Sequence, residues 1–250
     1  MPSFRSDIVD IAYEVAGEGP PVLLIHGFAS NARVNWIDTG WVKALTGAGY
    51  QTITFDNRGH GESGKLYDPE AYTAPEMAED ARRLLDHLGL SRVRVMGYSM
   101  GARIAAFLTL HHPERVTAAV FSGLAENMIR GFGGSDAIAD ALEAPAADSV
   151  SDPSARVFRV FAEQTKGDLR ALAACMRSGR QKITSAELAG IRVPVLVVAG
   201  DMDDIAGKVD PLVAAIPGAK GITLARRNHM NAVGDRQHKE EVINFLNSID

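Results

Sequence analysis

The chain has 250 residues, 46% of them hydrophobic, and a formal net charge of −5. This size and composition fit one compact domain, or one domain with an insert, and they exclude a disordered chain. The acidic balance excludes a protein that binds nucleic acid through a basic face, and the one cysteine, Cys175, excludes an internal disulfide and a cysteine-rich metal site.

Short apolar runs, most of them followed by glycine, recur along the chain. Residues 8–15 come first and are predicted as an edge strand. The runs predicted as buried strands are residues 22–25, 51–55, 93–96, 116–121 and 193–198, and a last strand is expected at 221–225. Runs that are apolar on both sides suit strands buried between two layers of helices, and strands that alternate with helices form a mostly parallel sheet. The expected fold is therefore α/β: a mostly parallel twisted sheet with helices on both faces.

Helical patterns fill the gaps between these strands. Residues 73–88 begin with Thr73-Ala74-Pro75-Glu76, which offers a capping box, and continue as an apolar stripe. Residues 100–110 are Ala-rich and apolar nearly all round, so a buried helix is expected there. The last helix is predicted at about residues 237–249.

A long stretch without a convincing strand interrupts this alternation. Residues 124–192 contain helical patterns at 137–147 and 154–179. An insert of this length between two buried strands predicts a helical cap. The sequence therefore divides into a core, residues 1–123 and 193–250, and a cap, residues 124–192.

Gly97-Tyr98-Ser99-Met100-Gly101 is a G-x-S-x-G sequence that lies between a predicted strand and a predicted helix. A serine held on such a tight turn is exposed, and the start of the helix supplies amide donors for a developing negative charge. Ser99 is therefore predicted as a nucleophile. The alternative is a serine that merely caps the helix in an ordinary turn.

A serine nucleophile needs a base and an acid that orients the base. His229 follows the last predicted strand, so it belongs to the carboxyl edge of the sheet, where open α/β sheets bind ligands. Asp203 follows the strand at 193–198 at the same edge, with Asp204 as the reserve candidate. The order Ser99, Asp203, His229 is the order typical of this motif. His26 is predicted as a structural loop residue, and no metal site is expected.

The oxyanion that such a reaction creates needs two hydrogen-bond donors. The backbone amide of Met100, directly after the nucleophile, is one candidate. The amide of Phe28, in the loop after the strand at 22–25, is the other.

These motifs resemble the α/β-hydrolase fold family, in its esterase, C–C hydrolase and cofactor-free haloperoxidase branch. The matching segments are residues 24–28, 56–63, 97–101, 194–200 and 228–230. In the family the acid usually stands three residues after the strand-end glycine, which is Asp203 here. The chain departs from the family at Asp204, where proline is common, and at Asn228, where glycine is usual. The resemblance implies acyl transfer through Ser99, Asp203 and His229, without a cofactor.

Several bulky residues of the insert could line the substrate pocket: Met128, Phe132, Phe158, Phe161 and Met176. The alternative is that they form the small core of the insert itself. A basic stretch within residues 156–182 could attract an anionic substrate, although a solvated helix face is the preferred interpretation.

The main hypothesis is a hydrolase of small or medium, fairly apolar carboxylic esters. The alternatives are a C–C bond hydrolase, lactonase or perhydrolase with the same three residues, and a non-catalytic scaffold that binds a ligand or partner. The expected partner is a small-molecule ester or related acyl compound. No apolar run approaches the ~18 residues of a membrane span, and residues 1–10 lack an apolar signal segment, so a cytoplasmic location is expected.

Overall fold

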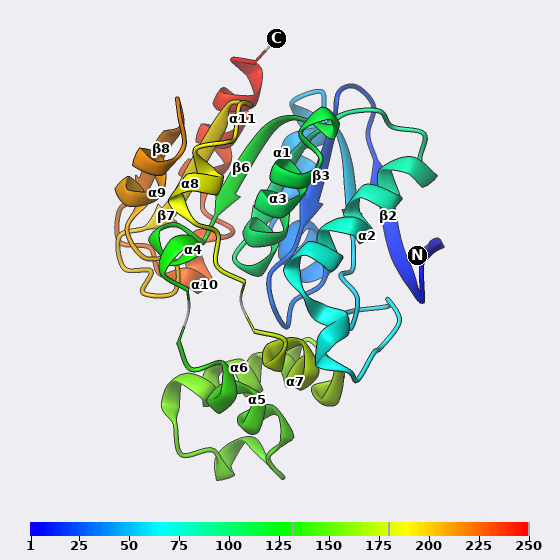
Figure 1. Cartoon of the computed structure of the whole chain (residues 1–250), viewed down its shortest axis with the longest axis vertical. Helices are drawn as coiled ribbons and strands as arrows, with labels where there is room; N and C mark the ends of the chain where they lie inside the picture. The colour runs from blue at the N-terminus through cyan, green and yellow to red at the C-terminus, as the bar shows by residue number, and fades with distance from the viewer. Residues whose placement is uncertain (132, 180, 250) are drawn as a thin grey trace.

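The computed structural model describes residues 1–131, 133–179 and 181–249. Within them, eight strands form one sheet in the order β1-β2-β4-β3-β5-β6-β7-β8 (Figure 1). β1 and β2 are antiparallel to their neighbours, and the strands from β4 to β8 in this order are parallel. The strands are β1 Ser3–Ser6, β2 Val9–Ala16, β3 Pro21–Ile25, β4 Gln51–Phe55, β5 Val93–Tyr98, β6 Val116–Ser122, β7 Val195–Gly200 and β8 Lys220–Leu224. The predicted mostly parallel sheet is confirmed.

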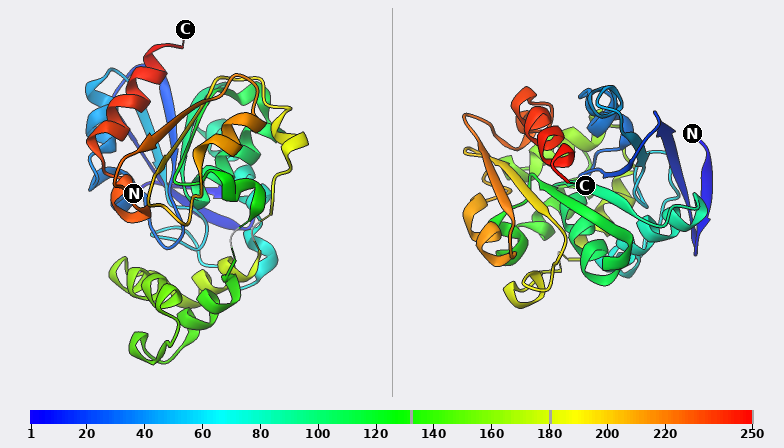
Figure 2. Two further views of the ribbon diagram at one scale, coloured as in Figure 1. Left: turned by 90° about the vertical axis from the view of Figure 1, so that its left-hand side faces the viewer. Right: turned by 90° about the horizontal axis from the view of Figure 1, so that it is seen from above.

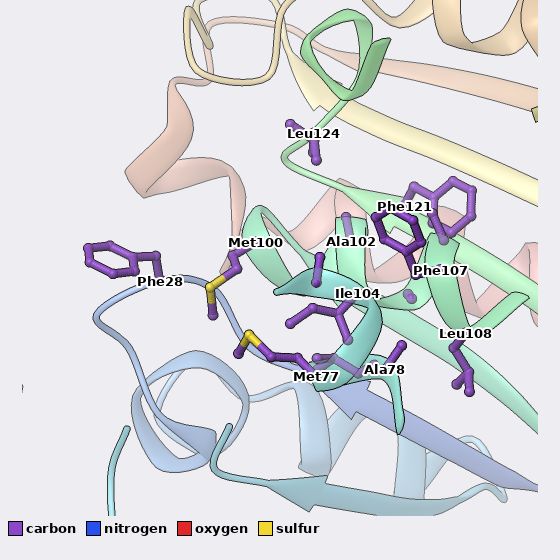
Figure 3. Packing of buried hydrophobic residues seen from close by; sticks show 14 of the residues in the cluster. Phe28, Met77, Ala78, Met100, Ala102, Ile104, Phe107, Leu108, Phe121 and Leu124 are labelled. Atoms are coloured by element: carbon purple, nitrogen blue, oxygen red, sulfur yellow. The ribbon is translucent and has the colours of Figure 1, made fainter. Parts of the chain in front are cut away.

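Both faces of the sheet are covered by helices, as predicted. Alternate side chains of a strand belong to different cores: in β3, Leu23 and Ile25 join one cluster, while Val22 and Leu24 join the other. Helices α2 (Ala74–His87) and α3 (Met100–His111) pack on the first cluster (Figure 3). Helices α1 (Trp41–Gly47) and α11 (Arg236–Asn247) cover the second cluster.

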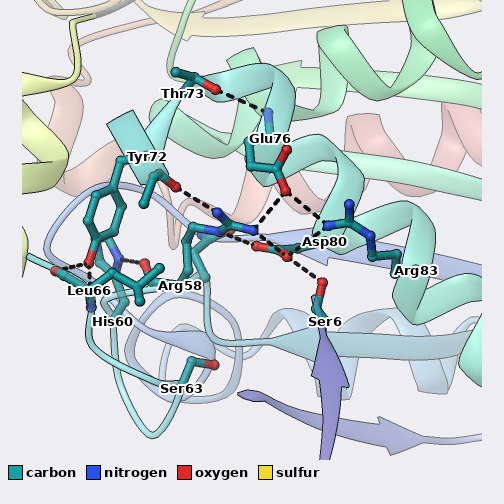
Figure 4. Close-up of polar contacts among 12 residues, drawn as sticks. Ser6, Arg58, His60, Ser63, Leu66, Tyr72, Thr73, Glu76, Asp80 and Arg83 are labelled. Carbon is teal, nitrogen blue, oxygen red and sulfur yellow. Dashed lines mark hydrogen bonds and ion pairs between the residues drawn. The ribbon is translucent and has the colours of Figure 1, made fainter. Parts of the chain in front are cut away.

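A buried ion pair connects the loop after β4 to α2. Arg58 and Asp80 are each 1% exposed at their side chains, and the Arg58 Nε donates to the Asp80 carboxylate at 2.6 Å (Figure 4). Thr73 caps α2 by accepting from the backbone N–H of Glu76, as predicted. The Glu76 carboxylate does not complete a capping box, because it pairs with Arg58 at 3.2 Å and with Arg83 at 3.0 Å.

The chain between β6 and β7 contains helices α4 (Glu126–Arg130), α5 (Ser135–Glu143), α6 (Pro153–Gln164), α7 (Leu169–Arg177) and α8 (Ser185–Leu188), together with the short turn η4 (Ala147–Ser149). Helices α5, α6 and α7 form a layer of their own beyond one edge of the sheet (Figures 1 and 2). Helices α4 and α8 instead contact α9 (Val209–Ala215), on the side of the main body. The division into core and cap stays a prediction. If it holds, helices α5 to α7 form the main part of the cap.

Several features of the fold differ from the sequence prediction. Strand β1 and helices α1 and α9 were not expected, because short segments carry little periodicity. The helical pattern at 154–179 is two helices, α6 and α7, rather than one. The chain breaks at Lys166, whose φ of 56° ends α6, and Asp168 then caps α7 by accepting from two backbone N–H groups. No helix in the described residues is long and apolar enough to cross a membrane.

Candidate active site

Ser99 lies on a sharp turn between β5 and α3. Its backbone has φ 55° and ψ −115°, a conformation that costs a non-glycine residue about 1–3 kcal/mol. Close packing surrounds this turn: a Cβ at Gly97 would lie 2.1 Å from the carbonyl oxygen of Gly101, and a Cβ at Gly101 would lie 1.9 Å from that of Ile25. The two glycines of the motif are therefore required by the approach of α3 to the ends of β5 and β3.

His229 begins the short helix α10 (His229–Ala232), and its imidazole faces Ser99. The distance from His229 Nε2 to Ser99 Oγ is 3.0 Å. Asn228, the departure from the family pattern, is the N-cap of α10: its Oδ1 accepts from the backbone N–H groups of Met230 and Asn231 at 3.1 and 3.0 Å. Its φ of −98° needs no glycine, so this substitution leaves the loop unstrained.

Asp203 follows β7 and lies against the other nitrogen of the same ring. The His229 Nδ1 is 3.0 and 2.9 Å from the two Asp203 carboxylate oxygens. The Asp203 Oδ1 also accepts from the backbone N–H groups of Ile205 and Ala206, at 3.1 and 2.9 Å. Asp203 is buried while the reserve candidate, Asp204, is exposed, so the geometry favours Asp203.

This arrangement assigns the protons of the ring. A carboxylate that accepts from two backbone amides is an acceptor toward Nδ1 as well, so His229 carries its proton on Nδ1. Nε2 is then left to accept from the Ser99 hydroxyl. The three side chains therefore form a chain of hydrogen bonds in which a proton on Oγ can pass to Nε2.

The predicted oxyanion donors flank the turn. Met100 is the first residue of α3, where a backbone N–H has no partner within the helix. Phe28 follows Gly27, whose own N–H donates to the Asn35 side chain at 3.0 Å. Phe28 and Met100 line the same small chamber beside Ser99, and Figure 3 shows their two segments next to each other.

His26 lies beneath this loop and is fully buried. Its Nδ1 is 2.8 Å from the Gly27 carbonyl oxygen, and its Nε2 accepts from the backbone N–H of Asn57 at 2.9 Å. Burial lowers the pKa of His26, so the ring is neutral. This geometry matches the predicted structural role.

Two neighbouring spaces are both lined by Ser99. The larger cavity has a volume of about 300 Å³. Its lining is Gly27, Phe28, Ser30, Val34, Asn35, Thr39, Tyr98, Ser99, Val157, Phe158, Phe161, Ile205, His229, Met230 and Val233. The smaller chamber, of about 40 Å³, is lined by Phe28, Ser99, Met100, Arg103, Leu124, Phe158, Met176 and Ile205. The larger space is mostly apolar and suits an apolar substrate group.

The predicted pocket residues are only partly brought together. Phe158 lines both spaces, Phe161 lines the larger cavity and Met176 lines the smaller chamber. Met128 lies in neither lining and is fully buried on α4, so its prediction as a pocket residue is wrong. Phe132 lies outside the described residues.

Three arginines of the basic stretch bind groups of the insert. Arg156 and Arg159 donate to backbone carbonyls within the insert, and Arg177 pairs with Asp140 and Glu143. These three arginines thus connect the helices of the insert to one another.

Some residues of the site were not found from the sequence. Asn35 holds Gly27, Tyr98 contacts His229, and Arg103 lines the smaller chamber. Arg103 stands one helical turn after Ser99, and this spacing was a signal that could have been used. Asn35 carries no such local signal. In the described residues, no group of three His, Cys, Asp or Glu side chains is arranged to hold a metal ion.

Comparisons with known proteins identify the family to which this chain is similar. The alpha/beta hydrolase fold model matches residues 20–159. A putative non-heme bromoperoxidase, BpoC, from Mycobacterium tuberculosis is 39% identical over 113 residues, which are 45% of this chain and 41% of that protein. The match thus spans less than half the length of this relative.

Solved structures match over nearly the whole chain. A hydrolase from Pseudomonas aeruginosa PA01 superposes with a TM-score of 0.77 at 26% identity, covering 99% of this chain and 98% of that one. An enol-lactonase from Burkholderia xenovorans LB400 superposes with a TM-score of 0.80 at 22% identity, covering 99% and 100%. The second likeness shows the fold alone.

Proposed function

Because this chain belongs to the alpha/beta hydrolase fold family, we propose that it is a serine hydrolase that cleaves carboxylic esters of small to medium, mostly apolar substrates. The observation that carries the proposal is the contact of Ser99, His229 and Asp203 at the wall of an apolar cavity. A protein that only binds a ligand has no need of this connected set of donor and acceptor groups.

The reaction begins with attack by the Ser99 Oγ on the ester carbonyl carbon. As the new C–O bond forms, the Oγ proton passes to His229 Nε2, and Asp203 stabilises the imidazolium. The carbonyl oxygen becomes an oxyanion, which the amides of Phe28 and Met100 bind. When this intermediate collapses, the ester C–O bond breaks and the imidazolium gives its proton to the leaving alcohol.

Water completes the cycle on the acyl-enzyme. His229, neutral again, takes a proton from the water as it attacks the acyl carbon. The second tetrahedral intermediate releases the carboxylic acid, and Ser99 recovers its proton from the imidazolium. The mostly apolar lining around Ser99 favours these charge transfers, because interactions between charges strengthen where water is excluded.

The test is hydrolysis of p-nitrophenyl esters from acetate to decanoate by the wild type and by Ser99→Ala. We expect activity in the wild type that the substitution abolishes, with a chain-length optimum set by the cavity of about 300 Å³. No activity in the wild type would refute the esterase proposal and favour another bond or a binding role. Equal activity in both proteins would refute Ser99 as the nucleophile.

A second candidate reaction is favoured by the place of Arg103. This arginine lines the smaller chamber next to Ser99, and its guanidinium donates to the backbone carbonyls of Asn127, Met128 and Gln181. A substrate with a carboxylate near the scissile bond would be attracted there, as in C–C hydrolysis of an unsaturated acid or hydrolysis of an acidic lactone. Faster turnover of ethyl hydrogen succinate than of ethyl valerate would favour this candidate. The cytoplasmic location and the small-molecule partner stay predictions.

A further inference from the structure

Tyr98 links the nucleophile turn to the base through a second contact. It stands directly before Ser99 at the end of β5, and its hydroxyl donates to the backbone carbonyl of His229 at 2.6 Å. The ring centroids of Tyr98 and His229 are 5.4 Å apart. Ser99 thus contacts the side chain of His229, while its neighbour Tyr98 contacts the backbone of His229.

The segment that carries His229 cannot hold this position alone. Helix α10 has only four residues, His229–Ala232, and an isolated helix of one turn is unstable in water. Carbonyls of α10 and of the residue after it instead contact side chains that lie outside this helix. Besides the Tyr98 contact, the His238 Nδ1 lies 2.9 Å from the Ala232 carbonyl oxygen, and the Trp41 Nε1 donates to the Val233 carbonyl at 2.6 Å.

Of these contacts, the Tyr98 contact bears directly on the base. The carbonyl that it binds belongs to His229 itself, whereas the others bind the end of α10 and the residue after it. Burial raises the pKa of Tyr98 well above its ordinary value, so the phenol remains a donor. The ring is 4% exposed and Gly123 packs against it so closely that a Cβ there would lie 2.7 Å from the Tyr98 Cζ. The hydroxyl is therefore fixed in place.

We propose that Tyr98 is a positioning residue: its hydroxyl keeps the backbone of His229 docked against the turn that carries Ser99. This inference rests on the proposed function. In the proposed reaction the bond between Ser99 Oγ and His229 Nε2 is broken once Oγ has attacked the carbonyl carbon, because Nε2 must then serve the leaving alcohol and, in the acyl-enzyme, the water. The backbone contact persists through these steps, and it holds the imidazole in line while the side-chain contact is absent.

The test is Tyr98→Phe, which removes one oxygen atom and keeps the ring. We expect kcat for a p-nitrophenyl ester to fall about tenfold with KM nearly unchanged, since a neutral hydrogen bond contributes about this factor. The rate at which diisopropyl fluorophosphate inactivates the enzyme by modifying Ser99 should fall by a similar factor, because that attack uses the same base. Circular dichroism and Tm report whether the variant is folded.

Tyr72→Phe is the matched control. The Tyr72 hydroxyl also donates to a backbone carbonyl at 2.6 Å, that of Leu66, and it accepts from the Leu66 backbone N–H at 3.1 Å. Tyr72 is 1% exposed and lines neither space at Ser99. Tyr72→Phe should lower Tm at least as much as Tyr98→Phe does, because its hydroxyl makes one bond more, but should leave kcat and the inactivation rate unchanged. Because both variants lose hydrogen bonds between a buried phenol and the backbone, a fall in kcat in Tyr98→Phe alone would indicate positioning rather than a loss of stability.

The outcomes separate this inference from the proposed function. If the wild type is active, Ser99→Ala is inactive and Tyr98→Phe matches Tyr72→Phe in kcat and inactivation rate, the positioning role is refuted and the proposed function stands. If Tyr98→Phe raises KM and leaves kcat unchanged, the hydroxyl acts on substrate binding and the inference is also refuted. If the wild type neither hydrolyses esters nor reacts with the fluorophosphate, the proposed function fails and this inference fails with it.

Discussion

Replacement of Asp203 by asparagine tests the proton assignment of the site. The Asp203 Oδ1 accepts from the backbone N–H groups of Ile205 and Ala206 at 3.1 and 2.9 Å, and only the oxygen of an asparagine amide can accept those bonds. The backbone therefore orients the amide so that its NH₂ group takes the place of Oδ2, the oxygen that lies 2.9 Å from His229 Nδ1 and slightly nearer to it than Oδ1. A donor in that place selects the tautomer with an unprotonated Nδ1 and a proton on Nε2. Nε2 then cannot accept the proton of Ser99.

The expected loss follows from this inversion. The wrong tautomer of the histidine in a Ser-His-Asp triad lowers kcat by roughly 10⁴-fold, which is about 5.5 kcal/mol in activation free energy. Because the backbone contacts survive, Tm should change little. The assay is kcat for a p-nitrophenyl ester, and ¹⁵N chemical shifts of His229 report the tautomer directly.

Asp204→Asn is the control for Asp203→Asn, because it removes the same charge one residue away from an exposed side chain. It should keep kcat within about twofold of the wild type. If Asp203→Asn retained a tenth or more of the wild-type kcat, or if His229 kept its proton on Nδ1 in that variant, the assignment would be wrong.

Three further predictions concern the frame of the site. Gly101→Ala places a Cβ 1.9 Å from a backbone carbonyl oxygen of β3 and should lower the free energy of unfolding by about 3 kcal/mol. Gly47→Ala, with open space around it in α1, should instead raise it by about 0.5 kcal/mol, and urea unfolding measures both changes. Asp80→Asn leaves the buried Arg58 without a carboxylate at 2.6 Å and should cost about 3–5 kcal/mol by the same measurement; a loss below 1 kcal/mol would contradict this. Burial lowers the pKa of His238 from 6.5 to about 4, so the unfolded chain binds the proton first as pH falls; the free energy of unfolding should decrease by about 3 kcal/mol between pH 6.5 and pH 4, and His238→Gln should show a correspondingly smaller decrease.

The sequence predicted the contact of Ser99, Asp203 and His229 because parallel strands end at one edge of a sheet. Each of the three residues follows a strand that could be recognised from its apolar run, so topology alone brings them close. Their roles as nucleophile, acid and base stay predictions until variants are measured. The fold class could be predicted for the same reason, since strands buried on both faces leave a clear pattern.

The rest of the site depends on contacts that leave no local pattern. Met128 is bulky and apolar, as pocket residues often are. A helix of five residues, however, has no periodicity that reveals which of its sides faces the cavity. Glu76 has the spacing of a capping box, yet the buried guanidinium of Arg58 competes for its carboxylate and is the stronger partner. Asn35 accepts a hydrogen bond from the backbone N–H of Gly27, a contact that only the tertiary structure creates. In each case a nonlocal contact decided the outcome.

The backbone at the site shows how closely its geometry depends on the surrounding fold. Ser99 and Ala29 both have positive φ, 55° and 57°, which neither residue prefers. The first is held by the packing of Gly101 against β3, and the second carries a carbonyl that accepts from the Thr165 hydroxyl, after α6, at 2.7 Å. Strain of this kind persists only where neighbouring structure over-determines it. The sheet therefore fixes Ser99, while the insert contacts the loop next to Phe28. A change in how the insert packs should thus move the predicted oxyanion donor, the amide of Phe28, before it moves Ser99.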